Sequence, residues 1–144
     1  MIVRDILKGK AAEGVITVAP GLSVEEAARI LSEKRIGSVV ISKDGKDCAG
    51  ILSERDIVRE LGRRGSACMA DKVDDMMTRK IETCDLSEQA ESVLIRMTEG
   101  RFRHMPVIEG GEMVGIITIG DVVKARLLEL AMEKDALEGM IMGH

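Results

Sequence analysis

Two short motifs combine a hydroxyl, a carboxylate and the expected start of a helix. They are Ser53-Glu54-Arg55-Asp56 and Thr118-Ile119-Gly120-Asp121. Each lies where an apolar strand pattern ends and a helical pattern begins. A helix start offers unpaired N–H groups and a partial positive charge, which suit a phosphate. The aspartate would repel a phosphate but accepts two hydrogen bonds from a ribose diol well, so the whole motif suits a sugar phosphate.

The same spacing also has a purely structural interpretation. S/T-x-x-D at a helix start is a capping box, in which the hydroxyl satisfies a free helix N–H and the acid reaches back to the chain. That role needs no ligand. The two interpretations are compatible, because a side chain can cap one way and bind another, and the sequence leaves both open.

A second polar feature is Arg103-His104, followed by Met105-Pro106-Val107. The proline holds the preceding residue extended, so the basic pair is expected to begin a strand. Earlier in the chain the corresponding residues are Gly37 and Ser38, while Arg55 is the cation beside the first motif. Two such sites would differ in polyphosphate preference. The alternative is a solvated basic loop, and His104 is not expected to bind a metal because no second histidine or thiol lies at a suitable spacing.

Both motifs belong to an internal duplication of the chain. Val3-Arg4-Asp5-Ile6-Leu7 recurs as Val73-Asp74-Asp75-Met76-Met77, Thr17 recurs as Thr83, and Gly50-Ile51 recurs as Gly115-Ile116. The drift in spacing is explained by loops of different length. We therefore predict two similar units, residues 1–70 and residues 71–144, with the second ending in a longer helix.

Hydrophobic periodicity predicts the same order of elements, β-α-β-β-α, in each repeat. Extended segments at 15–18 and 81–84 precede helices with apolar faces, and the paired strands are joined by turns rich in glycine and acid. One small sheet with two helices makes a thin core, so we expect an α+β fold in which the two sheets pack against each other with pseudo-two-fold symmetry. The helix faces are Val24, Ala27, Ala28 and Leu31, then Ala90, Val93, Leu94 and Met97; the strands are 38–42, 49–52, 104–108 and 113–117; the closing helices are 54–63 and 119–138.

Composition restricts the function classes. The chain has 144 residues, a net charge of -4 and 1% aromatic residues, which argues against a nucleic-acid partner. No apolar stretch is long enough to span a bilayer and the start lacks the layout of a secretion signal, so we expect a cytoplasmic protein without a membrane partner. Cys48, Cys68 and Cys84 are odd in number and widely spaced, so we interpret them as small buried or half-buried residues.

These motifs strongly resemble a tandem pair of cystathionine beta-synthase (CBS) domains, a Bateman module. The resemblance covers about residues 1–140. The chain is similar to short stand-alone bacterial CBS-pair proteins. Each motif is loose alone, whereas two motifs in register are specific. The matching stretches are 16–20, 35–40 and 50–56 in the first repeat, and Thr83, 103–107 and 115–121 in the second.

The resemblance implies a regulatory module that binds an adenosine-containing ligand in the clefts between its repeats: AMP, ADP, ATP, S-adenosylmethionine or NAD(H). In the family the hydroxyl and aspartate of the motif hold ribose and phosphate, while strand backbone contacts the adenine. The first repeat departs from the family pattern by having Val40 at the position of Pro106. The second repeat has Gly120 at the position of Arg55, so Arg103 would replace that cation. The residues carried over are Thr17, Val18, Ser38, Val39, Ser53, Arg55 and Asp56, then Thr83, Cys84, Arg103, His104, Met105, Pro106, Thr118, Gly120 and Asp121.

The resemblance also implies a homodimer shaped as a flat disc, and an effector protein would respond to a ligand-driven population shift. The apolar stripe of the last helix runs past the repeat and favours an oligomer contact (Val122, Val123, Leu127, Leu130, Ala131 and Leu137). The alternative function is a ligand-free dimeric interaction scaffold whose motifs only cap helices. An enzyme is not expected, because no nucleophile–base pair, P-loop or metal cluster occurs, so neither a catalytic cofactor nor a metal is expected.

Overall fold

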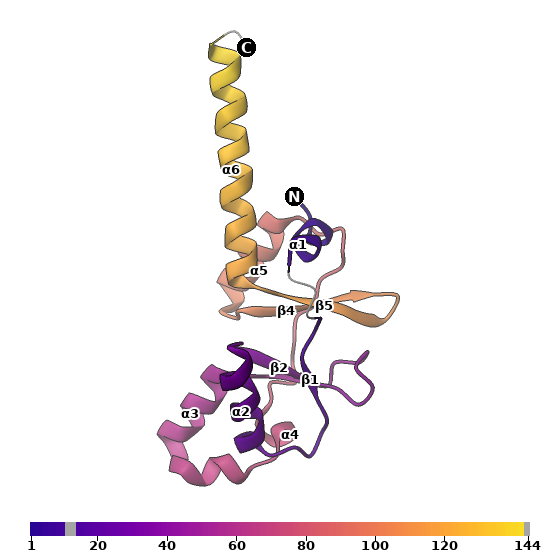
Figure 1. Cartoon of the computed structure of the whole chain (residues 1–144), viewed down its shortest axis with the longest axis vertical. Coiled ribbons are helices and arrows are strands. Elements are labelled where there is room, and N and C mark those ends of the chain that lie inside the picture. Colours follow the sequence, from indigo (N-terminus) through magenta and orange to yellow (C-terminus); the bar gives the residue numbers. More distant parts are fainter. Residues whose placement is uncertain (11–13, 143–144) are drawn as a thin grey trace. The chain divides into compact units, whose positions relative to one another are not determined.

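The computed structural model of the chain describes residues 1–10 and 14–142. Its elements follow the predicted order in the first repeat, and the second repeat has all of them except its first strand (Figure 1). The first repeat contains β1 (Thr17–Val18), α2 (Val24–Lys34), β2 (Ser38–Ile41), β3 (Gly50–Ser53) and α3 (Glu54–Arg64). The second contains α5 (Ala90–Gly100), β4 (His104–Glu109), β5 (Glu112–Thr118) and α6 (Ile119–Ile141). Three short elements complete the order: α1 (Val3–Gly9), the 3₁₀ helix η1 (Gly65–Ala70) and α4 (Val73–Met76).

The described chain forms two compact units, each with its own core. The first unit comprises residues 14–82 and 110–114, and the second comprises 1–10, 83–109 and 115–142. The predicted helix faces are confirmed: Val24, Ala27 and Leu31 are buried in the first core, and Val93 and Met97 in the second. The α+β class and the two repeats are therefore confirmed.

The strands of the first unit form one sheet in the order β1-β2-β3. β1 pairs with β2 in parallel, and β2 pairs with β3 antiparallel, which sets Ser38 opposite Ser53. In the second unit β4 pairs with β5. This register brings the start of β2 to the end of β3, where α3 begins.

The strand predicted over residues 81–84 is wrong in extent. Only Cys84 pairs, as an isolated parallel bridge to Val107. The Cys84 N–H donates to the Pro106 carbonyl, and the Ile108 N–H donates to the Cys84 carbonyl. In the first repeat the ladder is extended by a bond from the Val40 N–H to the Ile16 carbonyl. Pro106 stands at the position of Val40 and has no N–H, so the second repeat cannot form the corresponding bond. The Thr83 carbonyl accepts from the Arg96 guanidinium at 2.8 Å.

The short helices α1 and α4 lie in the unit of the opposite repeat. α1 precedes the first repeat but packs in the second unit, where the Val3 N–H donates to the Glu88 carbonyl and the Ala90 N–H donates to the Met1 carbonyl. α4 makes the equivalent pair of bonds in the first unit, from Val73 to the Leu22 carbonyl and from Val24 to the Asp71 carbonyl. The boundaries of the compact units therefore differ from those of the sequence segments 1–70 and 71–144. The division of the chain into those two duplicated segments stays a prediction.

Gly50 and Gly115 hold equivalent positions beneath these two helices. A Cβ on Gly115 would lie 2.8 Å from Leu7 Cδ2 on α1. A Cβ on Gly50 would meet the Met77 side chain and lie 2.9 Å from the Thr78 carbonyl oxygen. Two backbone hydrogen bonds between Ile51 and Thr78 hold β3 at this close approach. Glycine is required at Gly50 because the backbone in front of it cannot rotate away.

We expect Gly50→Ala to lower the free energy of unfolding by about 1–3 kcal/mol, because the added methyl group overpacks this contact. Gly62→Ala is the matched control: Gly62 lies in α3 with nothing within 4 Å of an added Cβ. That control should be stabilised by up to about 1 kcal/mol through helix propensity. Urea unfolding measures both, and a Gly50→Ala protein as stable as the parent would refute the close contact.

Candidate functional site

The second repeat's motif forms a complete capping box at the start of α6. The Asp121 N–H donates to Thr118 Oγ1 at 3.2 Å, and the Thr118 N–H donates to Asp121 Oδ2 at 2.9 Å. The Ile119 N–H donates to the Arg103 carbonyl at 2.9 Å. Of the first three N–H groups of α6, the described hydrogen bonds thus occupy the first and third. The second belongs to the exposed Gly120 and remains available to an anion.

The first repeat repeats this arrangement at the start of α3. The Asp56 N–H donates to Ser53 Oγ at 3.2 Å, the Ser53 N–H donates to Asp56 Oδ2 at 2.9 Å, and the Glu54 N–H donates to the Gly37 carbonyl. Among the described hydrogen bonds the N–H of exposed Arg55 is again the one left open. The capping interpretation is confirmed at both motifs.

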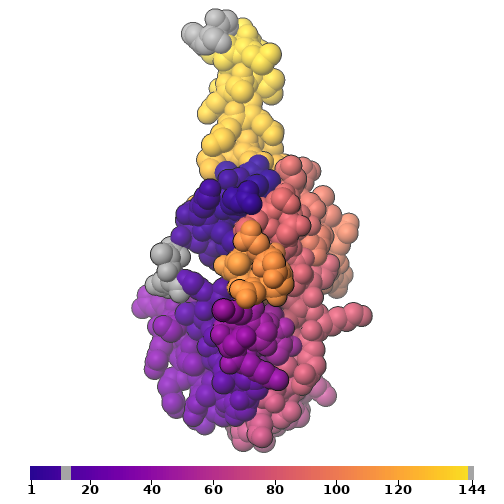
Figure 2. Space-filling view, turned by 90° about the vertical axis from the view of Figure 1, so that its right-hand side faces the viewer, coloured from indigo at the N-terminus to yellow at the C-terminus, as the bar shows by residue number. Residues whose placement is uncertain are grey.

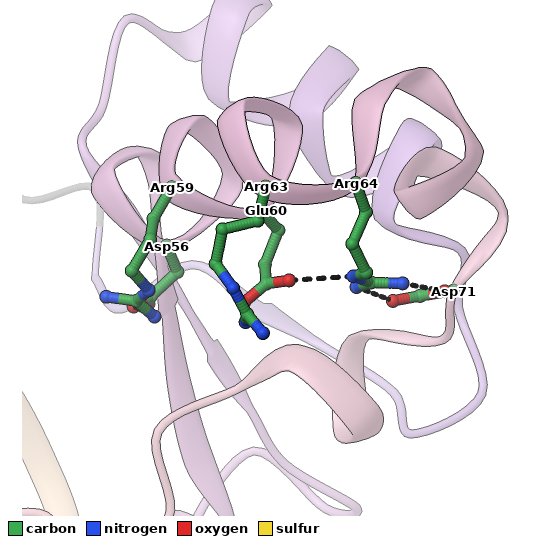
Figure 3. A network of polar contacts seen from close by, with 6 residues as sticks. All are labelled: Asp56, Arg59, Glu60, Arg63, Arg64 and Asp71. Carbon is green, nitrogen blue, oxygen red and sulfur yellow. Dashed lines mark hydrogen bonds and ion pairs between the residues drawn. The ribbon is translucent and has the colours of Figure 1, made fainter.

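The carboxylate of Asp56 is more fully occupied than that of Asp121. It is 7% exposed, its Oδ2 also accepts from the Ser53 hydroxyl at 3.0 Å, and its Oδ1 pairs with Arg59 at 2.9 Å. In Figure 3 the Arg59 guanidinium turns toward Asp56 at the beginning of α3. A ribose diol bound at this site would have to share the Asp56 carboxylate with Arg59.

Further along α3, Arg64 joins the helix to the segment after η1. Its guanidinium lies 2.8 Å from Glu60 and 2.5 Å from Asp71 (Figure 3). The hydrogen bond from Arg64 lowers the pKa of both carboxyl groups. These exposed pairs contribute little to stability but fix the end of α3.

Lys10, which the motif analysis missed, lies at the second site. Its ammonium is 2.8 Å from Asp121 Oδ2 and 2.9 Å from the Ile116 carbonyl oxygen, which it reaches from just after α1. Burial raises the pKa of Asp121, but hydrogen bonds from Lys10 and the Thr118 amide outweigh it and hold the pKa below its usual 3.8. One signal was present in the sequence: Lys10 recurs as Lys80, at the separation that relates Val3 to Val73.

The lowered pKa of Asp121 predicts how Lys10 contributes to stability across pH. A carboxyl group with a depressed folded-state pKa stabilises the fold above its unfolded pKa, and this contribution is lost as pH falls through the folded value. Lys10→Met should therefore unfold more easily than the parent at neutral pH, and the difference should disappear in acid below the usual 3.8. Urea unfolding from pH 7 to pH 2.5 measures this, and a difference that persists unchanged would contradict the ion pair.

The remaining first-repeat residues lie along β1 and β2. Ser38 is half-buried and paired with Ser53, and half-buried Thr17 pairs with Val40 on the neighbouring strand. Val18 and Val39 are buried in the core, with exposures of 7% and 0%, so they offer no exposed side chain to a ligand. Contact of these residues with a ligand stays a prediction.

Among the second-repeat residues, Arg103 lies at the start of α6. It supplies the carbonyl that accepts from Ile119, and its side chain is exposed, as is Thr83. His104 is half-buried, whereas Met105 and Pro106 are buried and offer no exposed side chain to a ligand.

Cys84 is buried, which confirms the structural interpretation of this cysteine. Desolvation by burial raises the pKa of its thiol to about 12. A thiol that stays protonated is a poor nucleophile, which argues against a thiol-based sensor at this position. Cys68 is also buried and Cys48 half-buried.

Other kinds of site are poorly represented among the described residues. A shallow surface depression along α5 is lined by Gln89, Glu91, Ser92, Ile95 and Arg96, none of them a predicted site residue. Residues 1–10 and 14–142 contain no group of three histidine, cysteine or acidic side chains placed to hold a metal. Within the same ranges no helix has the length and apolarity needed to cross a membrane.

Comparison with known proteins matches both repeats to one family model. The CBS domain model matches residues 3–63 and 73–128. A CBS domain-containing protein of Arabidopsis thaliana, CBSX3, mitochondrial, is 32% identical over 98% of this chain and 72% of its own length. The crystal structure of a CBS-domain containing protein from Agrobacterium tumefaciens has a TM-score of 0.82 and 40% identity, covering 88% of this chain and 99% of that one.

Two other similar structures contain adenosine compounds. The structure of CBSX2 in complex with AMP has 28% identity and a TM-score of 0.72, over 88% of this chain and 96% of that one. The CBS domain pair of protein MJ0100, in complex with 5′-methylthioadenosine and S-adenosyl-L-methionine, has 27% identity and a TM-score of 0.73, over 90% and 96%.

Proposed function

Because this chain belongs to the CBS-domain family and contains a tandem pair of its repeats, we propose that it is a regulatory module that binds an adenosine-containing nucleotide. The ligand would lie at the two capping motifs, at Asp121 and Asp56. One observation carries the proposal most directly. Both helix starts satisfy their first and third N–H groups internally and leave the second, at an exposed residue, beside a capping carboxylate.

This geometry supports the two halves of a nucleotide separately. The open N–H and the positive end of the 23-residue α6 favour a phosphate. The hydrogen bonds given above for Asp121 use Oδ2, so that Oδ1 can accept from a ribose hydroxyl. Backbone near Cys84 and Met105 would hold the adenine.

The relatives support adenosine as the shared part of the ligand, since their compounds are AMP, 5′-methylthioadenosine and S-adenosyl-L-methionine. Two of these carry no phosphate. The open helix N–H groups of this chain favour a phosphorylated compound, so AMP, ATP and NAD(H) are the ligands proposed.

A thermal unfolding series tests the proposal. A ligand present at a hundred times its Kd adds about 2.7 kcal/mol of stability, which raises Tm by about 8 °C for a domain of this size. We expect this shift with AMP, ATP or NAD(H), and a smaller one with GMP or CMP at equal concentration. Absence of a shift with every adenine compound would overturn the proposal.

The ligand would signal by shifting a population of conformations toward an arrangement that an effector protein recognises. Ligand and effector need a coupling of about 1–3 kcal/mol, which a few charge-assisted hydrogen bonds supply. The effector should therefore bind with different affinity in the presence and absence of nucleotide.

We further propose that the distal part of α6, residues 127–141, pairs with a second copy of this chain. In Figures 1 and 2 the C-terminal part of this segment extends past α1 and α5 of its own unit, while Glu129 near its start pairs with the Met1 amino group. Leu127, Leu130, Leu137 and Ile141 are 49–83% exposed and repeat at the a/d spacing of a coiled coil, with Lys134 in the same row. Four acidic side chains against one lysine disfavour an anionic membrane as the occupant.

The same exposed helix face favours a second candidate function, a ligand-free dimeric scaffold. In that case Asp56→Ala and Asp121→Ala would each lower stability by about 1 kcal/mol through loss of a cap and leave partner binding intact. Partner binding that depends on nucleotide would exclude the scaffold.

A further inference from the structure

We propose that Lys10 is a ligand-binding residue of the second repeat's site and makes that site selective for phosphorylated adenosines over uncharged ones. The inference rests on the nucleotide site proposed above. It adds a residue that lies outside both S/T-x-x-D motifs and reaches the site from the segment after α1.

The position of the Lys10 ammonium is fixed by two acceptors. One is Asp121 Oδ2 at 2.8 Å, and the other is the Ile116 carbonyl oxygen at 2.9 Å, on the strand that leads into α6. An ammonium group has three donors, so one remains for a ligand. The Lys10 side chain is 31% exposed and the Asp121 side chain 24%, so the pair is held firmly yet remains accessible to solvent.

The charge on Lys10 removes an obstacle to phosphate binding. A lone Asp121 carboxylate at the start of α6 would repel a phosphate that approaches the open Gly120 N–H. The ammonium at 2.8 Å neutralises that carboxylate while leaving its second oxygen free for a ribose hydroxyl. Lysine also binds phosphate directly as a point charge.

Comparison of the two repeats shows why this cation is needed. The first motif carries its own cation, Arg55, next to Asp56, whereas the second has Gly120 at that position. The exposed Arg103 was the substitute suggested by the sequence. In the structure it is Lys10 that contacts the motif's carboxylate.

The selectivity gives a test that separates binding from folding. In Lys10→Met the stem is kept and the charge removed. We expect AMP affinity at this site to fall about tenfold to a hundredfold, the range for loss of a hydrogen bond to a charged group. Adenosine affinity should change by less than about threefold, because adenosine lacks the group that Lys10 recognises. The ratio of AMP to adenosine affinity therefore collapses.

Titrations followed by the NMR amide signals of Gly120 and Asp121 report on the second site alone. Lys8→Met is the matched control, since Lys8 is an exposed lysine of α1 and its loss changes net charge equally. This control should keep the parental ratio. In the ligand-free protein, the carboxyl signal of Asp121 should titrate at higher pH in Lys10→Met than in the parent.

Three results would overturn the inference. In the first, Lys10→Met weakens AMP and adenosine by the same factor, which indicates a structural role. In the second, it leaves both affinities unchanged. In the third, the parent protein binds neither compound, which refutes the proposed function itself and this inference with it. If the parent protein binds AMP, the nucleotide-binding proposal stands and only the role of Lys10 is in question.

Discussion

Asp121→Ala is expected to weaken AMP binding at the second repeat's site by about a hundredfold or more. The substitution removes the acceptor for two ribose hydroxyls, and hydrogen bonds to a charged group contribute about 1.5–3 kcal/mol each. It also removes the partner of Lys10 and one half of the α6 capping box. Loss of the cap should lower the free energy of unfolding by about 1 kcal/mol, so the protein should still fold.

Asp135→Ala is the matched control for this variant. Asp135 is an exposed aspartate of the same helix, well past the capping box, and its loss changes net charge by the same amount. Calorimetric titration of both variants with AMP, together with urea unfolding, separates affinity from stability. Parental AMP affinity in Asp121→Ala would show that Asp121 serves only as a cap.

Leu130→Glu is expected to convert the proposed dimer to a monomer. Leu130 is 49% exposed in the isolated chain and lies in the middle of the proposed seam, so a pair would bury it twice, once from each copy. Loss of two buried leucines costs about 4 kcal/mol or more, and two buried charges add to this. Dimer affinity should therefore fall about a thousandfold or more.

Met132→Glu provides the comparison for the seam. Met132 is also exposed, at 57%, but two residues further along it faces the opposite side of α6. Analytical ultracentrifugation over a range of concentrations should show a dimer for the parent and Met132→Glu, and a monomer for Leu130→Glu. A dimer that survives Leu130→Glu, or a parent that is monomeric, would rule out pairing through residues 127–141.

The parts of the fold that depend on local pattern could be predicted from the sequence. The buried faces of α2 and α5 follow from helical periodicity, and both capping boxes follow from the S/T-x-x-D spacing because each joins residues only three apart. α6 continues three residues past the predicted 138 because Gly139 lies within the helix and does not end it.

Contacts between segments distant in sequence could not be predicted in this way. The repeat of Val3–Leu7 at Val73–Met77 was visible, but nothing local shows that each copy packs in the opposite unit. That exchange carries Lys10 to Asp121, more than a hundred residues away. The strand over 81–84 is short for a local reason, because Pro106 has no N–H to donate to a longer ladder.

Arg59 illustrates a third case, in which the spacing already favours the observed pair. Asp56 is the only acidic residue three or four positions from Arg59, the separations that bring side chains together on a helix. The structure pairs Arg59 with the motif's aspartate. The two sites thus hold their carboxylates with different cations, one from the same helix and one from a distant segment.

Native mass spectrometry of the purified chain with AMP, ATP, NAD and GMP tests nucleotide binding most directly. The account predicts added mass for one or two adenine nucleotides per chain, retained in Asp135→Ala and reduced in Asp121→Ala. Spectra that show only the bare chain with every adenine compound, or equal binding of GMP, would contradict it.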